Sequence, residues 1–551
     1  MTWQTHEITN QFDELQNYNL LATDTPLREA LARAGADAFV PQLDRYGATL
    51  GQASTWALAD QANRHTPELK SFDARGRRVD QVEFHPAWHQ LMAFYRGQNL
   101  IAMPFADERP GRWSAWAAGF YLHGQVEAGT LCPATMTQAA IPLVQREPAL
   151  WAALKDKLLS PDHDERDAPL ERKKSIWVGM GMTEKQGGSD VRANTTTATP
   201  TGQGEREFTL RGHKWFFSAP MCDAHLVVAR TADGGPSCFF VPRWRPDGSK
   251  NPIEIQRLKN KVGNRSNSSS EVEFKDAHGI LMGEPGRGIP TIIEMATYTR
   301  LNCVVGSAAM VRQGLVQGLA YARQRKAFGR LLVDQPLMRA VLTDLALENE
   351  ANMVLMMRLA QAYERDDSPL EKAWKRVMTP AAKFWVCKRA VELTGETMEI
   401  FGGNGYVDDG VMGRLFREAP VNSIWEGSGN VMCLDVMRAI GKEPDLAQAL
   451  LLDLGQDLGQ CVGDDTRLRE TLQSLLAMLR EPPEQLEALG RRFCERLVLL
   501  AQACLLLRHA PTAVADAFIQ TRFDVQWGRV VGSIDTRELS VDAILQRAYP
   551  A

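Results

Sequence analysis

The chain has 551 residues, 44% of them hydrophobic and 24% charged, which is the composition of a globular protein long enough for three or four domains or subdomains. A formal net charge of −4 at pH 7 excludes a general electrostatic attraction of the whole chain to nucleic acid or to anionic lipid. The nine cysteines occur singly, with no Cys-x-x-Cys pair, so neither a disulfide framework nor a zinc ribbon is indicated.

An N-terminal helical domain is predicted over residues 1–178, because residues 27–158 carry a helical pattern interrupted at prolines. Within this segment, His85 and His89 have the four-residue spacing of two metal ligands on one helix face. No glutamate follows His85 and no third ligand is evident, so we interpret both side chains as hydrogen-bonded histidines and predict no metal site.

The hydrophobic period changes to two after about residue 176, which is typical of β-strands. Five alternating segments predict strands at residues 208–210, 214–218, 226–229, 238–241 and 271–274. They indicate an all-β domain over residues 179–284, folded as a small barrel or an orthogonal sandwich.

Long helices follow the β-domain and predict a helical bundle over residues 285–442. Residues 291–328 carry one continuous helical pattern, and Pro336 is placed to begin a second helix as its first-turn residue. A third helix is predicted over residues 370–401, with a kink or break at Pro380.

A C-terminal helical domain is predicted over residues 443–551. One face of residues 466–480 carries a stripe of leucines, at positions 468, 472, 475, 476 and 479, and a second stripe follows Pro482. The most apolar window, residues 497–507, is too short to span a bilayer, and the polar N-terminus lacks the apolar core of a signal peptide. We therefore expect a cytoplasmic protein.

Glu426 lies between Trp425 and Gly427, and Ser428 has the position of an N-cap residue before a new amphipathic helix. A carboxylate beside an indole and just ahead of a helix N-terminus can be poorly hydrated and still ionised at neutral pH, as a proton-abstracting base must be. Capping and turn chemistry alone also explain the pattern.

Two segments of the β-domain offer hydrogen-bond donors and an aromatic surface. Residues 182–183 and 187–189 supply backbone N–H groups, two hydroxyls and little bulk, which suits the edge of a flat ring and a pyrophosphate. Residues 215–218, Trp-Phe-Phe-Ser, are able to cover a ring face and add a hydroxyl. Taken separately, the first segment is also explained as a hairpin loop and the second as an ordinary core strand.

The sequence lacks the common motifs of nucleotide-binding domains. No Gly-x-Gly-x-x-Gly follows a strand and no Walker motif occurs, so a doubly wound nucleotide domain is not indicated.

Taken together and in this order, these motifs resemble those of the acyl-CoA dehydrogenase family. The matching elements span residues 176–440: Gly181-Met182-Thr183-Glu184 with Gly188-Ser189-Asp190, Gly212-His213-Lys214-Trp215 with Ser218, Arg325-Lys326-Ala327-Phe328-Gly329 with Gln335, Phe401-Gly402-Gly403-Asn404-Gly405-Tyr406, and Trp425-Glu426-Gly427-Ser428. The resemblance implies an α+β fold with an N-terminal helical domain, a central β-domain and a helical bundle, to which this chain adds an all-helical C-terminal extension.

The resemblance also implies an FAD cofactor. The residues that the resemblance implies as FAD-binding are Met180, Met182, Thr183, Gly188, Ser189, Phe216, Phe217, Ser218, Arg325, Phe328, Gln335, Gly402, Gly403, Ile424, Trp425, Gly427, Ser428 and Asn430. In the family, the Arg-x-x-Phe-Gly element reaches the FAD of a neighbouring subunit, and a guanidinium has the paired donors that a pyrophosphate needs.

In the family reaction a carboxylate removes the proton α to a thioester while a hydride leaves the β-carbon for the flavin. Glu426 occupies the base position that most branches use. Some isovaleryl-type enzymes place the base on the first bundle helix, where this chain has Thr299, and a threonine cannot act as that base. Glu426 is therefore the candidate catalytic residue.

The likeness is closer to one branch, the bacterial alkylation-response flavoproteins. It rests on the phrases GMGMTEKQGGSD, GHKWFFS, TPAAKF and PVNSIWEGSGN, on the earlier FHPAWH and QVEAG, and on the long C-terminal extension. This resemblance implies a homotetramer with one FAD per subunit and weak acyl-CoA dehydrogenase activity of the isovaleryl type. It further implies that the C-terminal domain binds double-stranded DNA and that the protein shields DNA from alkylating agents or destroys them.

The charge of the C-terminal domain does not by itself indicate DNA binding, since residues 441–551 hold 12 Lys and Arg against 16 Asp and Glu. Phosphate binding depends on local basic patches, and the candidates are Arg438, Lys442, Arg467, Arg469, Arg491, Arg492 and Arg496. The same residues are also explained as charged side chains on the solvated faces of amphipathic helices, with no role in DNA binding. Two alternatives stay open: a metabolic acyl-CoA dehydrogenase whose C-terminal domain serves oligomerisation, and a flavin-stabilised DNA-binding protein without turnover.

Overall fold

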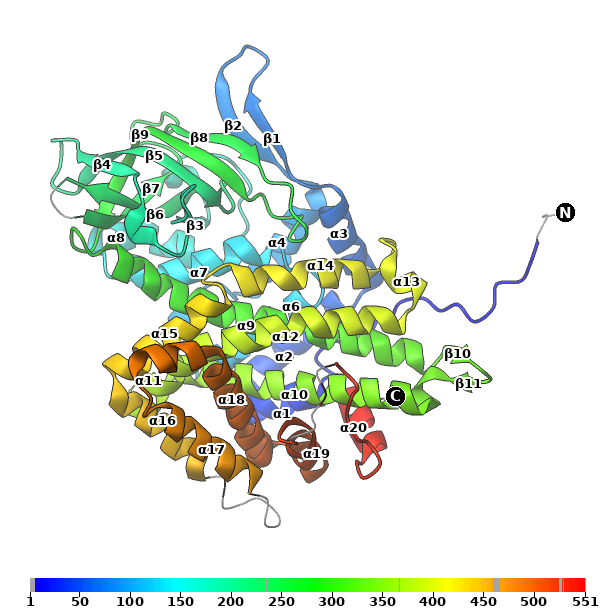
Figure 1. The fold of residues 1–551 in the computed structure, drawn as a ribbon. Helices are drawn as coiled ribbons and strands as arrows, with labels where there is room; N and C mark the ends of the chain where they lie inside the picture. The colour runs from blue at the N-terminus through cyan, green and yellow to red at the C-terminus, as the bar shows by residue number, and fades with distance from the viewer. Residues whose placement is uncertain are drawn as a thin grey trace. The chain divides into compact units, whose positions relative to one another are not determined.

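A computed structural model describes residues 5–232, 235–365, 367–456, 458, 466–524, 528 and 530–550 (Figure 1). The chain divides into two compact units, Met1–Ala53 with Cys303–Ala551, and Ser54–Asn302. Among the described residues, no helix combines the length and the apolarity needed to cross a membrane.

The unit of residues 54–302 begins with helices and a β-hairpin. Its helices are α3 (Ala53–Arg64), α4 (Pro86–Gly97), α5 (Met103–Ala106), α6 (Arg112–Gly124), α7 (Leu131–Gln145) and α8 (Pro148–Leu159). The hairpin, β1 (Glu68–Phe72) with β2 (Arg78–Glu83), corrects the expectation of a purely helical segment over residues 27–158. Leu69 and Val82 form a cross-strand pair that packs against the core of the β-domain, so tertiary contact supports strands that are short and rich in charge.

The β-domain is a small closed barrel, which is one of the two architectures that the alternating pattern predicted. Its seven strands are β3 (Val178–Gly181), β4 (Thr197–Pro200), β5 (Glu207–Phe217), β6 (Ala224–Thr231), β7 (Gly235–Pro242), β8 (Ile253–Leu258) and β9 (Ser270–Met282). The strand order is β3-β6-β4-β5-β9-β7, and pairing of β6 with β7 closes the ring, while β8 pairs with β9. The interior is apolar, with Leu210, Phe239 and Phe274 fully or almost fully buried.

The other unit holds the helical bundle. Its elements are α1 (Thr25–Arg33), α2 (Val40–Leu50), α9 (Gly288–Ala322, which begins in the other unit), the hairpin β10 (Lys326–Ala327) with β11 (Arg330–Leu331), α10 (Pro336–Glu364), α11 (Pro369–Ala373), α12 (Thr379–Ile400), α13 (Gly403–Tyr406), α14 (Val411–Ile424) and α15 (Gly429–Lys442). Pro336 begins α10, as predicted. The first long helix ends at Ala322 rather than at residue 328, because the chain turns there into the β10–β11 hairpin.

The helix predicted over residues 370–401 is interrupted just before Pro380. A π-helical turn, Trp374–Met378, joins α11 to α12, and Pro380 lies in the first turn of α12. Proline has no N–H to donate, and its ring crowds the carbonyl four residues earlier. The wider π-helical turn relieves this steric clash within the hydrogen-bonded helix.

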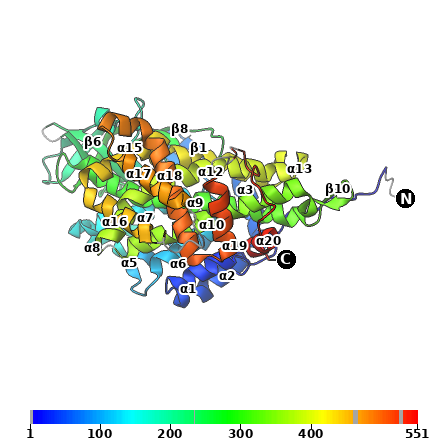
Figure 2. The same cartoon turned by 60° about the horizontal axis from the view of Figure 1, so that its bottom comes forward.

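The C-terminal helices pack against the bundle within the same unit. They are α16 (Pro444–Gln456), α17 (Arg467–Met478), α18 (Pro483–His509), α19 (Thr512–Arg522) and α20 (Val541–Ala548), and Figure 2 shows α16, α17 and α18 side by side. The predicted leucine stripe is buried at Leu468 and Leu475, whereas Leu476 is 40% exposed. The buried Arg522 of α19 pairs with Asp344 and with Glu348 of α10, at 3.0 Å from the latter, and so anchors this segment.

Candidate active site

A buried ion pair holds residues 182–189, the predicted hydrogen-bond donor segment that we call the donor loop, against the barrel. The Nζ atom of Lys214, on β5, lies 2.8 Å from Oε1 of Glu184, and both side chains are almost completely buried. Lys214 also donates to the carbonyl of Val228 at 2.8 Å, and Glu184 accepts from the N–H groups of Thr195 and Thr196 at 2.6 and 3.1 Å. Burial alone raises the pKa of Glu184, but the charge of Lys214 and these hydrogen bonds lower it to about 2. The sequence motifs contain both residues, but nothing in the local pattern indicated that they pair.

The predicted loop residues converge at the end of β3. Met180 lies on that strand, Met182 and Thr183 follow it, and all three are half-buried. The carbonyl of Thr183 accepts from the backbone N–H of Trp215 at 2.8 Å, which joins the loop to β5. A Cβ atom added to Gly188 would lie 2.6 Å from the hydroxyl oxygen of Thr183, so only glycine allows this close approach. Ser189, the next residue, is exposed.

The aromatic residues at the end of β5 point in different directions. Phe216 is 54% exposed, whereas Phe217 is fully buried in the barrel and its ring stacks on His225 at 4.1 Å between centroids. The expectation that both rings cover one face of a cofactor is therefore wrong for Phe217. A β-bulge between Lys214 and Phe217 shifts the alternation of side chains here, and the sequence pattern does not reveal it. Ser218 follows and is half-buried.

In the helical unit, Glu426 lies at a sharp corner between α14 and α15. Its φ of +58° is left-handed, and that of Gly427 is +100°. The buried ammonium of Lys383 donates to the carbonyl of Gly427 at 2.7 Å, and the indole N–H of Trp425 donates to Oδ1 of Asn422 at 3.0 Å, so the corner is held from both sides. Ser428 does occupy the N-cap position of α15, but its side chain makes no capping hydrogen bond. Burial raises the pKa of Cys303 on α9, the charge of Lys383 opposes this, and Cys387 and the charge of Glu426 raise the pKa further.

The remaining predicted residues of this unit lie in two places. Gly402 and Gly403 begin the short helix α13, with open space where each Cβ would be, and Ile424 and Asn430 flank the Glu426 corner. The others lie at the β10–β11 hairpin: Arg325 bonds through its guanidinium to the carbonyl of Asn10, Gln335 donates to the carbonyl of Ala327 at 2.8 Å, and Phe328 forms the tip.

Phe328 is 99% exposed and has a left-handed backbone, with φ of +51° followed by +79° at Gly329. Two consecutive left-handed residues make the tight turn of a two-residue hairpin, a position that favours Asn, Asp or Gly. Of the nine described non-glycine residues with positive φ, six are Asn or Asp, and the other three are Ala219, Phe328 and Glu426. All three belong to, or directly follow, the predicted site motifs.

Most of the basic residues predicted to bind DNA take part in helix packing. Arg491 donates to Asn430 at 3.0 Å, Arg467 and Arg469 donate to the carbonyls of Gln520 and Leu458 at 3.5 and 3.3 Å, and Arg496 bonds to the hydroxyl of Ser474. The other three, Arg438, Lys442 and Arg492, are exposed, and the described chain offers them no hydrogen bond or salt bridge.

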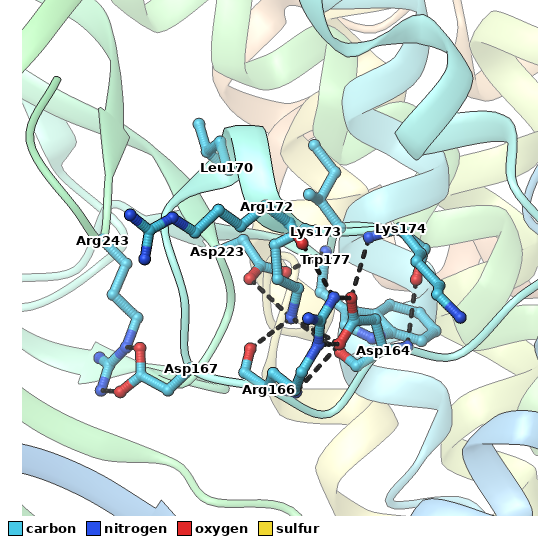
Figure 3. A network of polar contacts seen from close by, with 12 residues as sticks. Asp164, Arg166, Asp167, Leu170, Arg172, Lys173, Lys174, Trp177, Asp223 and Arg243 are labelled. Atoms are coloured by element: carbon cyan, nitrogen blue, oxygen red, sulfur yellow. Dashed lines mark hydrogen bonds and ion pairs between the residues drawn. The ribbon is translucent and has the colours of Figure 1, made fainter. Parts of the chain in front are cut away.

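A second polar cluster, which the sequence did not indicate, borders a cavity of about 890 Å³ in the unit of residues 54–302. Figure 3 shows its ion pairs: Lys173 lies 3.1 Å from Asp223, and Arg243 lies 3.0 Å from Asp167. Burial raises the pKa of Asp223 to about 6, against the opposing charge of Lys173. Lys173 and Arg243 balance the charges of these carboxylates. The ion pairs thereby tie residues 164–177 to the barrel.

The two histidines with metal-ligand spacing border this region and are hydrogen-bonded, as interpreted. His85 accepts from the N–H of Ala87 at 3.2 Å at the start of α4, and Nδ1 of His89 lies 3.1 Å from Nε2 of His163. In the described part of the chain, no three His, Cys, Asp or Glu side chains are placed to hold a metal ion.

Three family descriptions match successive parts of this chain. Residues 10–165 match the N-terminal domain of the adaptive response protein AidB, residues 179–277 match the middle domain of acyl-CoA dehydrogenases, and residues 286–441 match their C-terminal domain. AidB of Escherichia coli (strain K12), a putative acyl-CoA dehydrogenase, is 46% identical over 530 residues, which cover 96% of each chain.

Two solved structures share the fold of this chain. The structure of Caenorhabditis elegans ACDH-11 in complex with C11-CoA matches all of this chain and 95% of its own, with a TM-score of 0.84 and 25% identity. A Bacillus anthracis acyl-CoA dehydrogenase complexed with FAD shares the fold at 17% identity and a TM-score of 0.62, over 80% of this chain and 81% of its own. The chain therefore belongs to the acyl-CoA dehydrogenase family of FAD-dependent oxidoreductases, in the AidB branch.

Proposed function

We propose that this chain binds FAD, uses Glu426 as the base of a weak acyl-CoA dehydrogenase activity of the isovaleryl type, and binds double-stranded DNA to protect it from, or to inactivate, alkylating agents. The observation that carries the catalytic part is the left-handed backbone of Glu426, held by Lys383 and by Asn422. A non-glycine residue in this conformation costs about 1–3 kcal/mol and persists where the surrounding structure holds it in place, and such residues cluster at active sites and ligand-binding sites.

The residues of the β-domain loop fit an FAD ring system. Thr183 and Ser189 supply hydroxyls, Gly188 leaves room that a side chain would fill, and the half-exposed Phe216 adds an aromatic face. Bound FAD supplies the two-electron acceptor for the hydride that leaves the β-carbon of the substrate. The chain itself has to orient the thioester and remove its α-proton, and we assign proton removal to the carboxylate of Glu426.

We propose that FAD is also contacted by the predicted residues of α13, by those beside Glu426 and by those of the β10–β11 hairpin. We also propose a homotetramer, and Phe328 supports a contact between subunits, because an almost fully exposed aromatic ring at a turn position that favours glycine or asparagine has no local reason to be there. We propose that Phe328, with Arg325, contacts the FAD of a neighbouring subunit. The C11-CoA complex of ACDH-11 supports an acyl-CoA as the substrate class.

Gly188→Ala is expected to weaken FAD binding about tenfold or more, since the new Cβ pushes against Thr183 at 2.6 Å and displaces the hydroxyl. Fluorescence titration of the apoprotein with FAD measures the effect. Gly97→Ala, at the end of α4, is the matched control, because its Cβ meets nothing within 4 Å. Unchanged FAD affinity in Gly188→Ala would show that the loop does not hold the cofactor.

Duplex DNA binding is expected to be steeply salt-dependent if the protein neutralises DNA phosphates. The association constant K for duplex DNA falls as the salt concentration rises, so the slope of log K against log salt is negative. Replacing Arg438, Lys442 and Arg492 together by Ala should make this slope shallower by about 0.9 for each phosphate that the variant leaves unneutralised. Arg537→Ala is the control, because Arg537 is also exposed but already pairs with Asp535. Filter binding with a duplex of mixed sequence, over salt concentrations of about 50–200 mM, supplies the measurement.

A metabolic acyl-CoA dehydrogenase is the second candidate function. The net negative charge of residues 441–551 and the use of four candidate arginines in helix packing favour it. Anaerobic addition of acyl-CoA thioesters separates the candidates: rapid bleaching of the flavin without duplex binding supports metabolism, and duplex binding with scarcely any bleaching supports the alkylation response.

A further inference from the structure

Two cysteines meet where the bundle helix α15 packs against the C-terminal helix α18. Cys433 of α15 and Cys494 of α18 are both free thiols, they are hydrogen-bonded to each other, and 4% and 0% of their surfaces are exposed. They are 61 residues apart in the chain, so helix packing alone brings them together.

Neighbouring contacts keep the two helices in register at this point. Three residues before each cysteine, Asn430 and Arg491 form a hydrogen bond of 3.0 Å, so one turn of each helix separates this bond from the thiol pair. Gly490 lies one turn before Cys494, and a Cβ placed there would be 3.7 Å from the Cβ of Cys433. The glycine thus permits the close helix approach that a disulfide between facing helices requires.

The surroundings make the two thiols unequal. The hydrogen bond from Cys494 lowers the pKa of Cys433, burial opposes this, and the charges of Arg491 and Lys388 lower it further. The same hydrogen bond and burial raise the pKa of Cys494. Four other described cysteines have a pKa raised by burial, at positions 222, 238, 303 and 387. Cys433 is therefore set apart as the more readily ionised thiol, with Cys494 as its partner.

We propose that Cys433 and Cys494 form a reversible disulfide when the protein meets a peroxide, and that this bond locks α18 onto α15. The Cys433 thiolate attacks one oxygen of hydrogen peroxide, the O–O bond breaks, and the released hydroxide takes a proton to become water. The resulting sulfenic acid is attacked by the sulfur of Cys494, which loses its proton as a second water departs. Two thiols are oxidised and one peroxide is reduced to two waters.

The bond stabilises the region next to the Glu426 corner. The helix α15 begins three residues after Glu426, and Cys433 lies four residues further along it. A disulfide across 61 residues restricts the unfolded chain, and for a large protein this corresponds to a rise in melting temperature of about 5 °C. The proposal does not depend on the function proposed above.

Mass spectrometry and thermal melting of the full-length holoprotein test this inference. After brief exposure to hydrogen peroxide, the wild type should lose two free thiols, yield a peptide linking Cys433 to Cys494 that dithiothreitol releases, and melt about 5 °C higher. Cys433→Ala and Cys494→Ala should each abolish both the linked peptide and the rise in melting temperature. Cys387→Ala is the control and should retain both, because its buried thiol donates to the carbonyl of Cys303 and not to another thiol.

Three results overturn the proposal. They are retention of all thiols under excess peroxide, oxidation of Cys433 to sulfinic acid without a link to Cys494, and a linked peptide that leaves the melting temperature unchanged. If either alanine variant fails to fold, the corresponding serine variant takes its place, and peptide mapping of the wild type decides the pairing by itself.

Discussion

Glu426→Gln is expected to lower the rate of flavin reduction by acyl-CoA about 10²–10⁴-fold while FAD stays bound. The amide keeps the size of the side chain and the left-handed corner, but it cannot accept the α-proton of the thioester. Thr299 cannot replace the carboxylate, since it is buried and its hydroxyl donates to the carbonyl of Ala296 at 3.1 Å. Anaerobic stopped-flow recording of flavin absorbance gives the rate.

Glu399→Gln is the matched control for this measurement, because Glu399 is an exposed carboxylate on α12, in the same unit as Glu426. It should leave both FAD binding and flavin reduction unchanged. Persistent flavin reduction in Glu426→Gln would place the base elsewhere, and loss of FAD from that variant would instead assign the carboxylate a structural role.

Glu184→Gln is expected to destabilise the protein by about 3–5 kcal/mol, the usual cost of leaving a buried charge without its partner. Lys214 has no exposed side-chain surface, so its ammonium would have only the carbonyl of Val228 and the new amide as partners. Urea unfolding followed by circular dichroism gives the free energy. The double variant Glu184→Gln/Lys214→Met should recover part of the stability, since it removes the charge as well. A single variant within about 1 kcal/mol of the wild type would contradict the role of the pair.

The same pair predicts a pH dependence. The pKa of Glu184 is about 2 in the folded chain and near 4.5 when unperturbed, so the unfolded state takes up the proton first as the pH falls. The stabilisation is complete above about pH 4.5 and disappears between about pH 4.5 and 2, with a total of about 3 kcal/mol. The difference in stability between the wild type and Glu184→Gln should therefore shrink over that interval.

Several features near the candidate site could not be predicted from the sequence because they depend on partners distant in the chain. Glu184 and Lys214 are 30 residues apart and meet only because the donor loop crosses β5. The bulge that turns Phe217 inward exists because β5 pairs with β9, and no residue within β5 indicates it. The β1–β2 hairpin likewise owes its strands to packing against the barrel core.

Hydrophobic period, turn residues and short motifs are local properties of the chain, so the family, the loop motifs and the order of the larger helical and β regions could be predicted from the sequence. The folded chain was needed to show which residues of those motifs are buried and which are exposed, that Glu426 and Phe328 adopt left-handed backbones, and that Cys433 meets Cys494. Burial, strain and contact between distant residues arise when elements pack together, so no local pattern encodes them.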